Sequence, residues 1–277
     1  MTVIHASSER RSGRISFLGR VAAHARANYR GPFRRRPRKR PAGYSESHLT
    51  KGKSYHAFFR DRPGRRLMWE LEQSVLLQIL EEVGPVSRHL DFAGGTGRIA
   101  GFMQSRCETQ YILDISSAML DVAREHLEHA HVVCRDFREG VPEVPPQSVD
   151  MVTAFRFFPN ADEELRDAAM EFIASRLRPG GYLVCNNHRN FWSVPYVTAR
   201  LLFVGGADGM EHREMRDLAE CHGLQLIGSH SIGLIPQTDN HAMLPWGLVR
   251  MIEKACLAHI GRRTRAGYNV VYLFKKA

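Results

Sequence analysis

The chain is built around the sequence Arg88-His-Leu-Asp-Phe-Ala-Gly-Gly-Thr-Gly-Arg-Ile-Ala100. Its short apolar run ends at an acid, Asp91, and a glycine-rich turn follows at Gly94, Gly95 and Gly97. The residues after the turn are typical of the first turn of a helix. A strand, a glycine turn and a helix in this order let backbone N–H groups approach a ligand closely at the helix N-terminus. The sequence therefore predicts a ligand-binding site at this turn.

The same residues allow two interpretations of the ligand. Gly95-Thr-Gly-Arg-Ile-Ala100 fits the dinucleotide fingerprint G-x-G-x-x-G/A, which is a weak signal alone. A pyrophosphate disfavours a carboxylate beside the turn, whereas a cationic cofactor that carries an amino acid can use one, so Asp91 separates the two. The pattern Asp91-x-Ala93-x-Gly95-x-Gly97 resembles the acid-x-G-x-G-x-G signature of class I S-adenosylmethionine-dependent methyltransferases, with alanine at the first glycine. The resemblance covers roughly residues 85–277.

The positive charge of this protein is concentrated at one end. The net charge is +10, yet residues 1–42 hold twelve Arg or Lys and one acid, Glu9, while the remaining 235 residues hold 27 basic and 28 acidic residues. A like-charge, proline-containing segment such as Arg34-Arg-Arg-Pro-Arg-Lys-Arg-Pro41 predicts a disordered arm. Such an arm either aids solubility or binds RNA or an anionic membrane surface. Its Arg-rich, acid-poor composition also leaves open a transit peptide.

Composition predicts one α/β domain after this arm. At 277 residues and 43% hydrophobic content the chain is long enough for a sizeable core, and its apolar runs fall short of the roughly 20 residues that span a bilayer. Five scattered cysteines without a C-x-x-C pair favour a reducing compartment, and we expect a cytoplasmic protein. We expect three segments, namely the basic arm 1–42, a helical cap 43–84 and a cofactor-binding domain 85–277.

Strand and helix patterns alternate regularly along the domain. The pattern predicts an amphipathic helix from Leu67 to Leu80 and, after the strand ending at Asp91, further strands at 110–114, 131–134, 149–155, 182–187, 224–228 and 269–274. Helices are expected between them, including 210–222 and 244–260. Alternation of this kind predicts a seven-stranded, mostly parallel sheet with helices on both faces, a Rossmann-like fold. We expect Ser116 and Asn160 to cap the helices that follow them.

The methyltransferase resemblance implies further features of this fold. The last strand resembles the antiparallel edge strand of the family. The long connection after residue 187 and the helix at 244–260 are expected to form a lid over the acceptor. A segment such as 43–66 lies over the cofactor pocket in similar proteins, although simple packing of its aromatic residues explains the segment equally well.

The expected cofactor is S-adenosyl-L-methionine. Asp114 ends the second strand seventeen positions after Gly97, near the spacing of about 20 residues at which an acid accepts both hydroxyls of a ribose. The resemblance implies that the glycine turn also contacts the cofactor, through Asp91, Ala93, Gly94, Gly95 and Gly97.

The resemblance also places the adenine ring and the methionine portion of the cofactor. It implies that Asp136 accepts the adenine amino group, that Phe137 and Ile115 pack on the two faces of the ring, and that Phe155 lies near the methionine portion. For Asp136, the alternative is an exposed loop acid. Asp150 is expected to be structural.

The best candidate for a catalytic base is His188, at the carboxyl end of the fifth expected strand. Transfer of a methyl group from a sulfonium needs a base only if the acceptor must lose a proton, and a neutral imidazole suits that task. The alternative is a histidine that hydrogen-bonds a loop carbonyl. Arg156 and Arg189 are candidates for orienting an anionic or polyhydroxylated acceptor. A zinc site at His126 and its neighbours is disfavoured because no acid lies at ligand spacing, so no metal is expected.

These observations predict an S-adenosylmethionine-dependent enzyme that methylates a small molecule, at a hydroxyl oxygen. Two motifs of nucleic-acid methylation, an Asn/Asp-Pro-Pro-aromatic run and a Pro-Cys nucleophile, do not occur in the sequence. The rivals are an RNA methyltransferase that uses the basic arm and a non-catalytic scaffold that retains the cofactor fold. A nicotinamide reductase is a third rival, weakened by Asp91 and by the lack of a Ser/Tyr-x-x-x-Lys pair.

Overall fold

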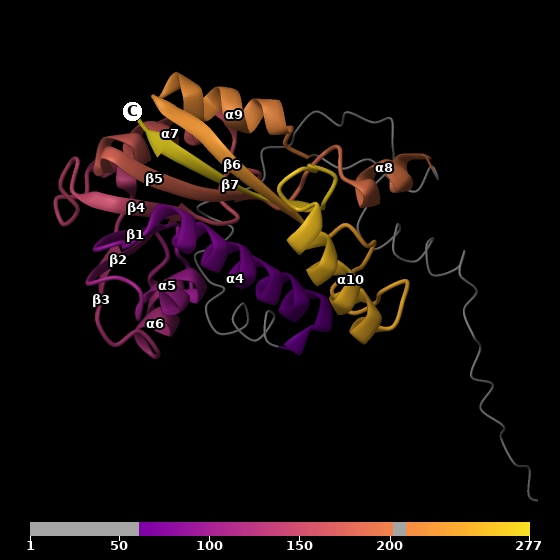
Figure 1. Ribbon diagram of the computed structural model, residues 1–277. Helices are drawn as coiled ribbons and strands as arrows, with labels where there is room; N and C mark the ends of the chain where they lie inside the picture. The colour runs from indigo at the N-terminus through magenta and orange to yellow at the C-terminus, as the bar shows by residue number, and fades with distance from the viewer. Residues whose placement is uncertain (1–60, 202–208) are drawn as a thin grey trace, which may run out of the picture.

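The computed structural model describes residues 61–201 and 209–277, and its centre is one seven-stranded sheet (Figure 1). The strand order is β3-β2-β1-β4-β5-β7-β6. The strands are β1 (Arg88–Phe92), β2 (Thr109–Asp114), β3 (Ala130–Cys134), β4 (Val149–Ala154), β5 (Leu177–Asn187), β6 (Leu224–Ile232) and β7 (Asn269–Lys276). The predicted Rossmann-like sheet is confirmed, and every expected strand is present.

The last strand of the sheet is not at its edge. β1 to β5 pair in parallel, while β7 runs antiparallel between β5 and β6. The prediction of an antiparallel edge strand is therefore correct in direction and wrong in position. The residues from Val270 to Phe274 are all apolar and fully buried. Such a strand is suited to the position between β5 and β6, because both of its faces and both of its edges are covered there.

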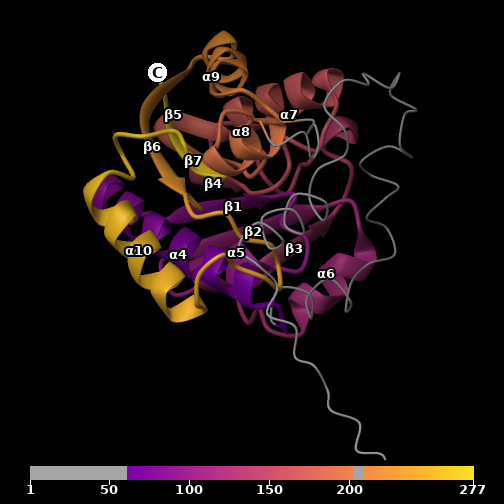
Figure 2. The ribbon, with the colours of Figure 1, turned by 90° about the vertical axis from the view of Figure 1, so that its right-hand side faces the viewer.

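Helices cover both faces of the sheet, as predicted (Figures 1 and 2). α7 (Glu163–Arg176) and α9 (His212–Cys221) share one apolar core, and α4 (Pro63–Val83) and α10 (Trp246–His259) share the other. The remaining helices are α5 (Arg98–Met103), α6 (Ser117–Arg124), α8 (Val194–Leu201) and the 3₁₀ helix η1 (Phe137–Glu139). Successive strand residues alternate between the cores, so Met151 faces α4 and Val152 faces α7.

α4 confirms and extends the expected helix at residues 67–80. Its buried residues include Leu67, Leu71, Val75 and Ile79, which recur at helical spacing and form the stripe that packs on the sheet. Pro63 opens the helix, where its missing N–H costs nothing, and Gly84 ends it with a φ of 79°. The helix also buries an acid, Glu72, which becomes important at the functional site.

Two local predictions need correction. Asp162, not Asn160, caps α7, because its carboxylate accepts the Leu165 N–H at 3.0 Å. Asn160 lies two residues earlier, and its amide donates back to the Arg156 carbonyl at 2.6 Å. β5 also begins directly after α7, at Leu177, and not at residue 182 as expected, so Pro179, Gly180 and Gly181 lie inside the strand. The expected cap Ser116 is confirmed, since its hydroxyl accepts the Met119 N–H.

α10 does not cover the ligand cavity described below. It packs against α4 and β6, and the described lining of the cavity contains no residue of this helix. The prediction that the helix at 244–260 forms part of an acceptor lid is therefore wrong. Its apolar side, with Val249 and Leu257, instead completes the core beneath α4.

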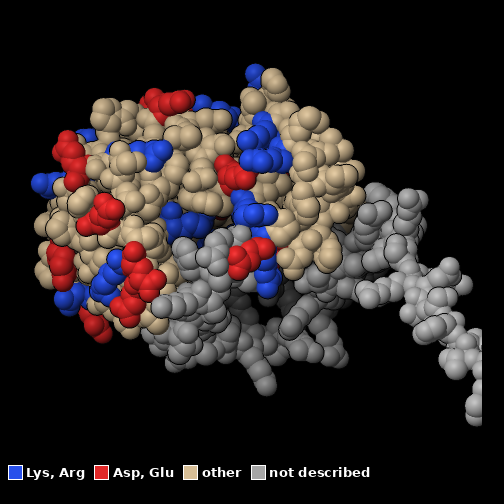
Figure 3. All heavy atoms as spheres, turned by 90° about the horizontal axis from the view of Figure 1, so that it is seen from below, with Lys and Arg blue, Asp and Glu red and all other residues tan. Residues whose placement is uncertain are grey.

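The expectations for the basic arm 1–42 and for the aromatic segment before Asp61 fall outside the described residues. Within the described residues, no helix combines the length and the hydropathy that a membrane crossing requires. Seen from below, the described surface shows basic and acidic side chains interleaved over a mostly uncharged background (Figure 3). This mixture agrees with the near balance of charge after residue 42.

Candidate functional site

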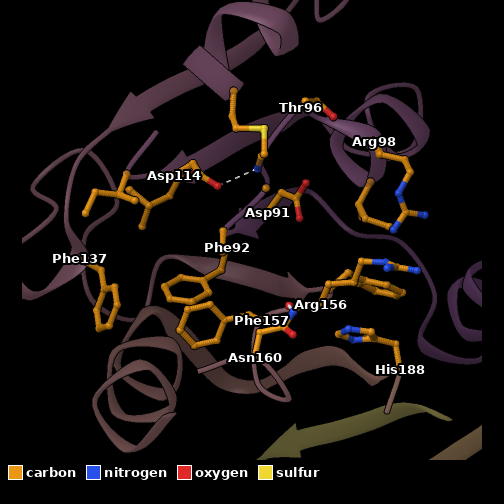
Figure 4. Close-up of a pocket in the computed structure, with 18 of the residues that line it drawn as sticks. Asp91, Phe92, Thr96, Arg98, Asp114, Phe137, Arg156, Phe157, Asn160 and His188 are labelled. Carbon is orange, nitrogen blue, oxygen red and sulfur yellow. Dashed lines mark hydrogen bonds between the residues drawn. The ribbon is translucent and has the colours of Figure 1, made fainter. Parts of the chain in front are cut away.

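A cavity of about 520 Å³ opens at the carboxyl ends of β1 and β4 (Figure 4). These neighbouring strands mark the place where the strand order reverses, and open α/β sheets bind their ligands at such a switch point. The volume lies within the range of roughly 300–1,000 Å³ that is typical of small-molecule sites. Predicted site residues in the lining are Asp91, Ala93, Gly94, Gly95, Asp114, Ile115, Asp136, Phe137, Phe155 and His188.

The glycine turn between β1 and α5 is shaped by close contacts. A Cβ atom on Gly94 would lie 2.6 Å from Ile112 Cγ1 and 2.9 Å from Asp91 Oδ2, so the position admits only glycine. Gly97 has a φ of 75°, and a Cβ there would lie 3.0 Å from Ala123 Cβ on α6. Gly97 itself does not line the described cavity. It lets α5 approach α6, which is a packing role rather than ligand contact.

Asp91 is the anchor of this turn. Its carboxylate accepts the Ala100 N–H at 3.1 Å and the Thr153 hydroxyl at 2.8 Å, so β1 supplies the N-terminal acceptor that Gly97 cannot give to α5. Burial raises the pKa of Asp91 from 3.8 to about 7. The two hydrogen bonds lower the pKa, but the effect of burial is larger. The carboxyl group lies at the centre of the cavity lining (Figure 4), and its first function in the structure is to hold the turn.

A buried polar network supports Asp91 from behind. His89 Nε2 lies 2.9 Å from the Thr153 hydroxyl oxygen, and His89 Nδ1 lies 3.1 Å from Gln110 Nε2. Because Thr153 donates its proton to Asp91, its oxygen accepts from His89 Nε2–H, and Gln110 donates to Nδ1. Burial lowers the pKa of His89 to about 3, so the ring is neutral and this donor order is fixed. Gln110 also donates to the Ala100 carbonyl at 3.0 Å, which closes the network on α5.

Asp114 lies at the end of β2, beside the glycine turn. One carboxylate oxygen accepts the Gly95 N–H at 2.9 Å and the other accepts the Ser116 N–H at 2.9 Å. Asp114 therefore joins the turn to the start of α6. It also lines the cavity, where the ribose contact stays a prediction.

The predicted adenine region combines an acid with aromatic rings. Asp136 caps η1 and holds Arg138 through both carboxylate oxygens, and the hydrogen bond from Arg138 lowers its pKa. Phe137 meets Phe92 edge to face at 5.2 Å between ring centroids, and Phe92 meets Phe157 in the same way at 5.1 Å. These rings line the cavity on the side of Asp114 and below Asp91 (Figure 4). The role of Asp136 in adenine binding stays a prediction.

The other end of the cavity is cationic. The His188 side chain projects into it beside Arg156, with Arg98 nearby (Figure 4), and Arg65 and Arg189 also line this end. His188 is 6% exposed, and its Nδ1 has no hydrogen-bond partner among the described residues. Burial, followed by the charges of the four arginines, holds the pKa of His188 well below 6.5, so the imidazole is neutral at pH 7. The alternative was that His188 hydrogen-bonds a loop carbonyl. Among the described residues, Nδ1 makes no such bond.

Arg156 adopts a strained backbone conformation at this end. Its φ is 64°, in the left-handed region that residues other than glycine seldom occupy. Two side-chain amides hold it there, since Asn186 accepts the Arg156 N–H at 2.6 Å and Asn160 donates to the Arg156 carbonyl at 2.6 Å. Both asparagines are therefore part of the site, although Asn160 had been predicted only as a helix cap.

α4 positions a further cation that the sequence analysis missed. Glu72, which is 1% exposed, pairs with Arg98 and accepts from Asn269 at 2.9 Å. The guanidinium group of Arg98 also lies 4.3 Å from the ring centre of Trp69, which is a cation–π contact with a second residue of α4. Arg98 is part of the glycine motif and could have been considered from sequence. Glu72 gave no signal, because one acid in an amphipathic helix reads as part of the solvent face.

Other residues lining the cavity were also missed, and they differ in how visible they were. Phe92 and Thr96 flank the predicted turn residues, so their positions in the motif carried a usable signal. Arg65 and Tyr268 reach the cavity from opposite ends of the described chain, and only the folded topology brings them together. Arg65 is held there by Asp239, which accepts its Nε–H at 2.7 Å.

Asp150 is structural, as expected. Its carboxylate accepts the N–H groups of Ser87 and Arg88 at 2.9 and 2.7 Å and pairs with Arg178, outside the cavity. These contacts fix the start of β1 against β4. Among the described residues, no group of His, Cys, Asp and Glu side chains is arranged to hold a metal ion.

Comparison with known proteins identifies the central part of the chain. Residues 90–181, which span β1 through the start of β5 and include the glycine turn, match the family model described as a methyltransferase domain. Over these residues, the chain is similar to methyltransferase domains. A curated protein described as a methyltransferase, from Claviceps purpurea, is 32% identical over 96 residues. That alignment covers 34% of this chain and 29% of the relative, so the chain matches less than a third of the length of the relative.

Solved structures extend the likeness of the methyltransferase domain to the whole fold. A possible histamine N-methyltransferase from Thermotoga maritima has a TM-score of 0.53 at 16% identity, covering 81% of this chain and 95% of its own. The N-methyltransferase NodS from Bradyrhizobium japonicum, solved with S-adenosyl-L-homocysteine, has a TM-score of 0.52 at 15% identity, covering 83% and 95%. At these identities the likeness shows the class I methyltransferase fold, which confirms the fold predicted from the glycine motif.

Proposed function

We propose that this chain binds S-adenosyl-L-methionine in the cavity and transfers the methyl group to a small-molecule acceptor, at a hydroxyl oxygen. One observation carries the proposal. The cavity of the methyltransferase domain joins a glycine turn flanked by Asp91 and Asp114 to a neutral, buried His188 at its far end. The first half suits a nucleoside cofactor, and the second half offers a base beside the place for an acceptor.

The residues of the turn fit the proposed cofactor. Gly95 lines the cavity, and a Cβ atom built on it meets no described atom nearer than Asp114 Oδ2 at 4.0 Å, so the atom would occupy ligand space. The absence of a side chain there leaves the backbone open to a close ligand. The carboxylate of Asp114 lines the cavity and suits the two hydroxyls of a ribose, and the rings of Phe137 and Phe92 offer an apolar side for adenine.

When bound, the cofactor would supply a methyl group on a positively charged sulfur, which is already an activated electrophile. The chain then needs to align the acceptor in line with that methyl group and to exclude water. In the proposed reaction a ring nitrogen of the neutral His188, which lines the cavity, accepts the proton of the acceptor hydroxyl. Phe155, which is buried and lines the cavity between the two ends, would close the apolar path around the reacting centre.

The test is calorimetric titration of S-adenosylhomocysteine into the purified protein. We expect saturable binding that is lost or weakened at least about tenfold in Asp114→Ala, because each charge-assisted hydrogen bond contributes roughly 1.5–3 kcal/mol. Asp121→Ala is the matched control, since Asp121 is an exposed acid of α6 outside the cavity. A folded wild-type protein that shows no binding would contradict the proposal and favour the non-catalytic scaffold.

A second candidate function is methylation of RNA delivered by the basic arm. The observation that favours it is the twelve basic residues against one acid in residues 1–42. RNA affinity of this kind falls steeply as salt rises, because bound counterions are released. We expect deletion of residues 1–42 to abolish any RNA binding measured by filter retention and to leave S-adenosylhomocysteine binding unchanged. Retained RNA binding in the deleted chain would instead assign RNA contact to the folded domain.

A further inference from the structure

The charges around His188 point to the chemical class of the acceptor, an inference that rests on the proposed function. Four guanidinium groups line this end of the cavity, from Arg65, Arg98, Arg156 and Arg189. The acids paired with them in the described contacts are Asp239 and Glu72. Over the described lining of this end, and with the central carboxyl of Asp91 included, the cationic groups outnumber the acidic ones.

The arginines come from four separate elements, so the cluster is a product of the fold and not of a basic segment. Arg65 lies on α4, Arg98 opens α5, Arg156 follows β4 and Arg189 follows β5. Arg65 and Arg98 are held by ion pairs with Asp239 and Glu72 at the back of the site. Such pairs fix the direction in which a guanidinium group points.

Arg156 and His188 add the second, independent observation. The left-handed backbone of Arg156 is maintained by Asn186 and Asn160, which is the kind of strain that accumulates at functional sites. His188 is more than nine-tenths buried, projects into the cavity beside Arg156 and has no partner for Nδ1 among the described residues (Figure 4). A ligand at this position would meet a neutral ring surrounded by fixed positive charge.

We propose that the acceptor is an oxyanion, a carboxylate or phosphate compound, whose charged group binds between Arg156 and Arg189 while its hydroxyl faces His188. Arginine suits this task because its planar fork binds carboxylate and phosphate oxygens through two parallel hydrogen bonds. The positive field also stabilises an alkoxide or phenoxide that forms when the hydroxyl loses its proton. The same charges keep His188 neutral and ready to accept that proton.

The probe is inorganic phosphate, titrated by calorimetry at constant ionic strength into protein saturated with S-adenosylhomocysteine. We expect saturable binding that weakens about tenfold or more in Arg189→Gln, whose exposed side chain can be changed without disturbing the core. Arg213→Gln is the matched control, because Arg213 is an exposed arginine of α9 outside the cavity. Arg156→Lys, which keeps the charge and loses the fork, is the second variant and should weaken phosphate binding while S-adenosylhomocysteine still binds.

Three outcomes would overturn the inference. Phosphate that binds only in the absence of S-adenosylhomocysteine would show that the arginines serve the carboxylate of the cofactor. Phosphate that fails to saturate the loaded protein, or binds equally well to Arg189→Gln, would show that no oxyanion site lies there, with the proposed function intact. Failure of S-adenosylhomocysteine itself to bind is seen in the preceding titration and would overturn both proposals.

Discussion

At the residue scale, the turn after β1 contains an alanine where the backbone favours glycine. Ala93 has a φ of 52°, in the left-handed region, which costs a residue with a Cβ roughly 1–2 kcal/mol. Glycine removes that cost but gains conformational entropy in the unfolded chain, about 0.4–1 kcal/mol. We expect Ala93→Gly to raise the free energy of unfolding by about 0.5–1 kcal/mol, measured by urea denaturation. A decrease would mean that the Ala93 methyl group contributes packing that outweighs the strain.

His188 is the residue on which the chemical step is expected to depend. We expect His188→Gln to slow methyl transfer by about 10²–10⁴-fold, the usual contribution of a general base, and to leave S-adenosylhomocysteine affinity unchanged. Transfer of labelled methyl groups into a small-molecule extract measures the rate, with His222→Gln as a control outside the cavity. Because the pKa of His188 lies well below 6.5, protonation of His188 should not reduce the wild-type rate between about pH 6.5 and 8.

Two results would contradict this role for His188. A variant that transfers methyl groups at the wild-type rate would show that the acceptor needs no base. A wild-type rate that rises in proportion to hydroxide across this pH range would assign deprotonation to the solvent or to the acceptor itself.

At the scale of elements, the join between β1, β4 and α5 depends on the hydroxyl of Thr153. Thr153→Val keeps the shape and removes the bridge, so Asp91 loses a donor and His89 Nε2 loses an acceptor. We expect a loss of about 1–3 kcal/mol in the free energy of unfolding, the cost of leaving buried polar groups unpaired. S-adenosylhomocysteine affinity should fall as well, since Asp91 holds the turn.

Thr153→Ser is the matched control, because it restores the hydroxyl without the methyl group. If stability and affinity are as low in Thr153→Ser as in Thr153→Val, Thr153 contributes packing and not the hydrogen bond. If Thr153→Val binds S-adenosylhomocysteine as tightly as the wild type does, the hydrogen bond from Thr153 to Asp91 does not contribute to ligand binding.

The sequence predicted the elements well because their signals are local. Short apolar runs mark β2 and β4, and helical spacing from Leu67 to Ile79 marks α4. The acids Asp91 and Asp114 end strands, so the parallel fold brings them to one edge. The cationic end of the cavity was harder to predict. Arg65, Glu72 and Tyr268 meet there only through long-range packing, and the left-handed backbone of Arg156 depends on the amides of Asn160 in the same loop and Asn186 on β5.

At the scale of the whole molecule, buried histidines set the response to acid. Burial lowers the pKa of His89 to about 3 and of His230 to about 4, while an unfolded histidine titrates near 6.5. As pH falls from about 6.5 to 4, the unfolded chain takes up protons that the folded chain excludes, so stability is lost. Asp91 acts in the opposite sense, since its raised pKa of about 7 lets the folded chain hold an extra proton. The extra proton on Asp91 therefore offsets the effect of one of these histidines on stability.

We therefore expect the urea midpoint to be lower at pH 5 than at pH 7.5. His230→Leu should reduce this difference, because His230 is fully buried and neither ring nitrogen has a hydrogen-bond partner among the described residues. His129→Leu, at an exposed histidine, is the control and should keep the wild-type pH response. An unchanged difference in His230→Leu would mean that His230 does not set the response to acid.

The central position of β7 has a consequence for how the protein is made. The sheet receives its last eight-residue strand, Asn269–Lys276, between two strands that were synthesised earlier. Until β7 leaves the ribosome, β5 and β6 each present an unpaired edge, and such edges pair readily with other chains. A nascent chain is therefore most exposed to aggregation in the interval between the synthesis of β6 and that of β7. A chain that stops at Tyr268 would remain in that state permanently, and sedimentation should find it in the pellet while the full-length protein stays in solution.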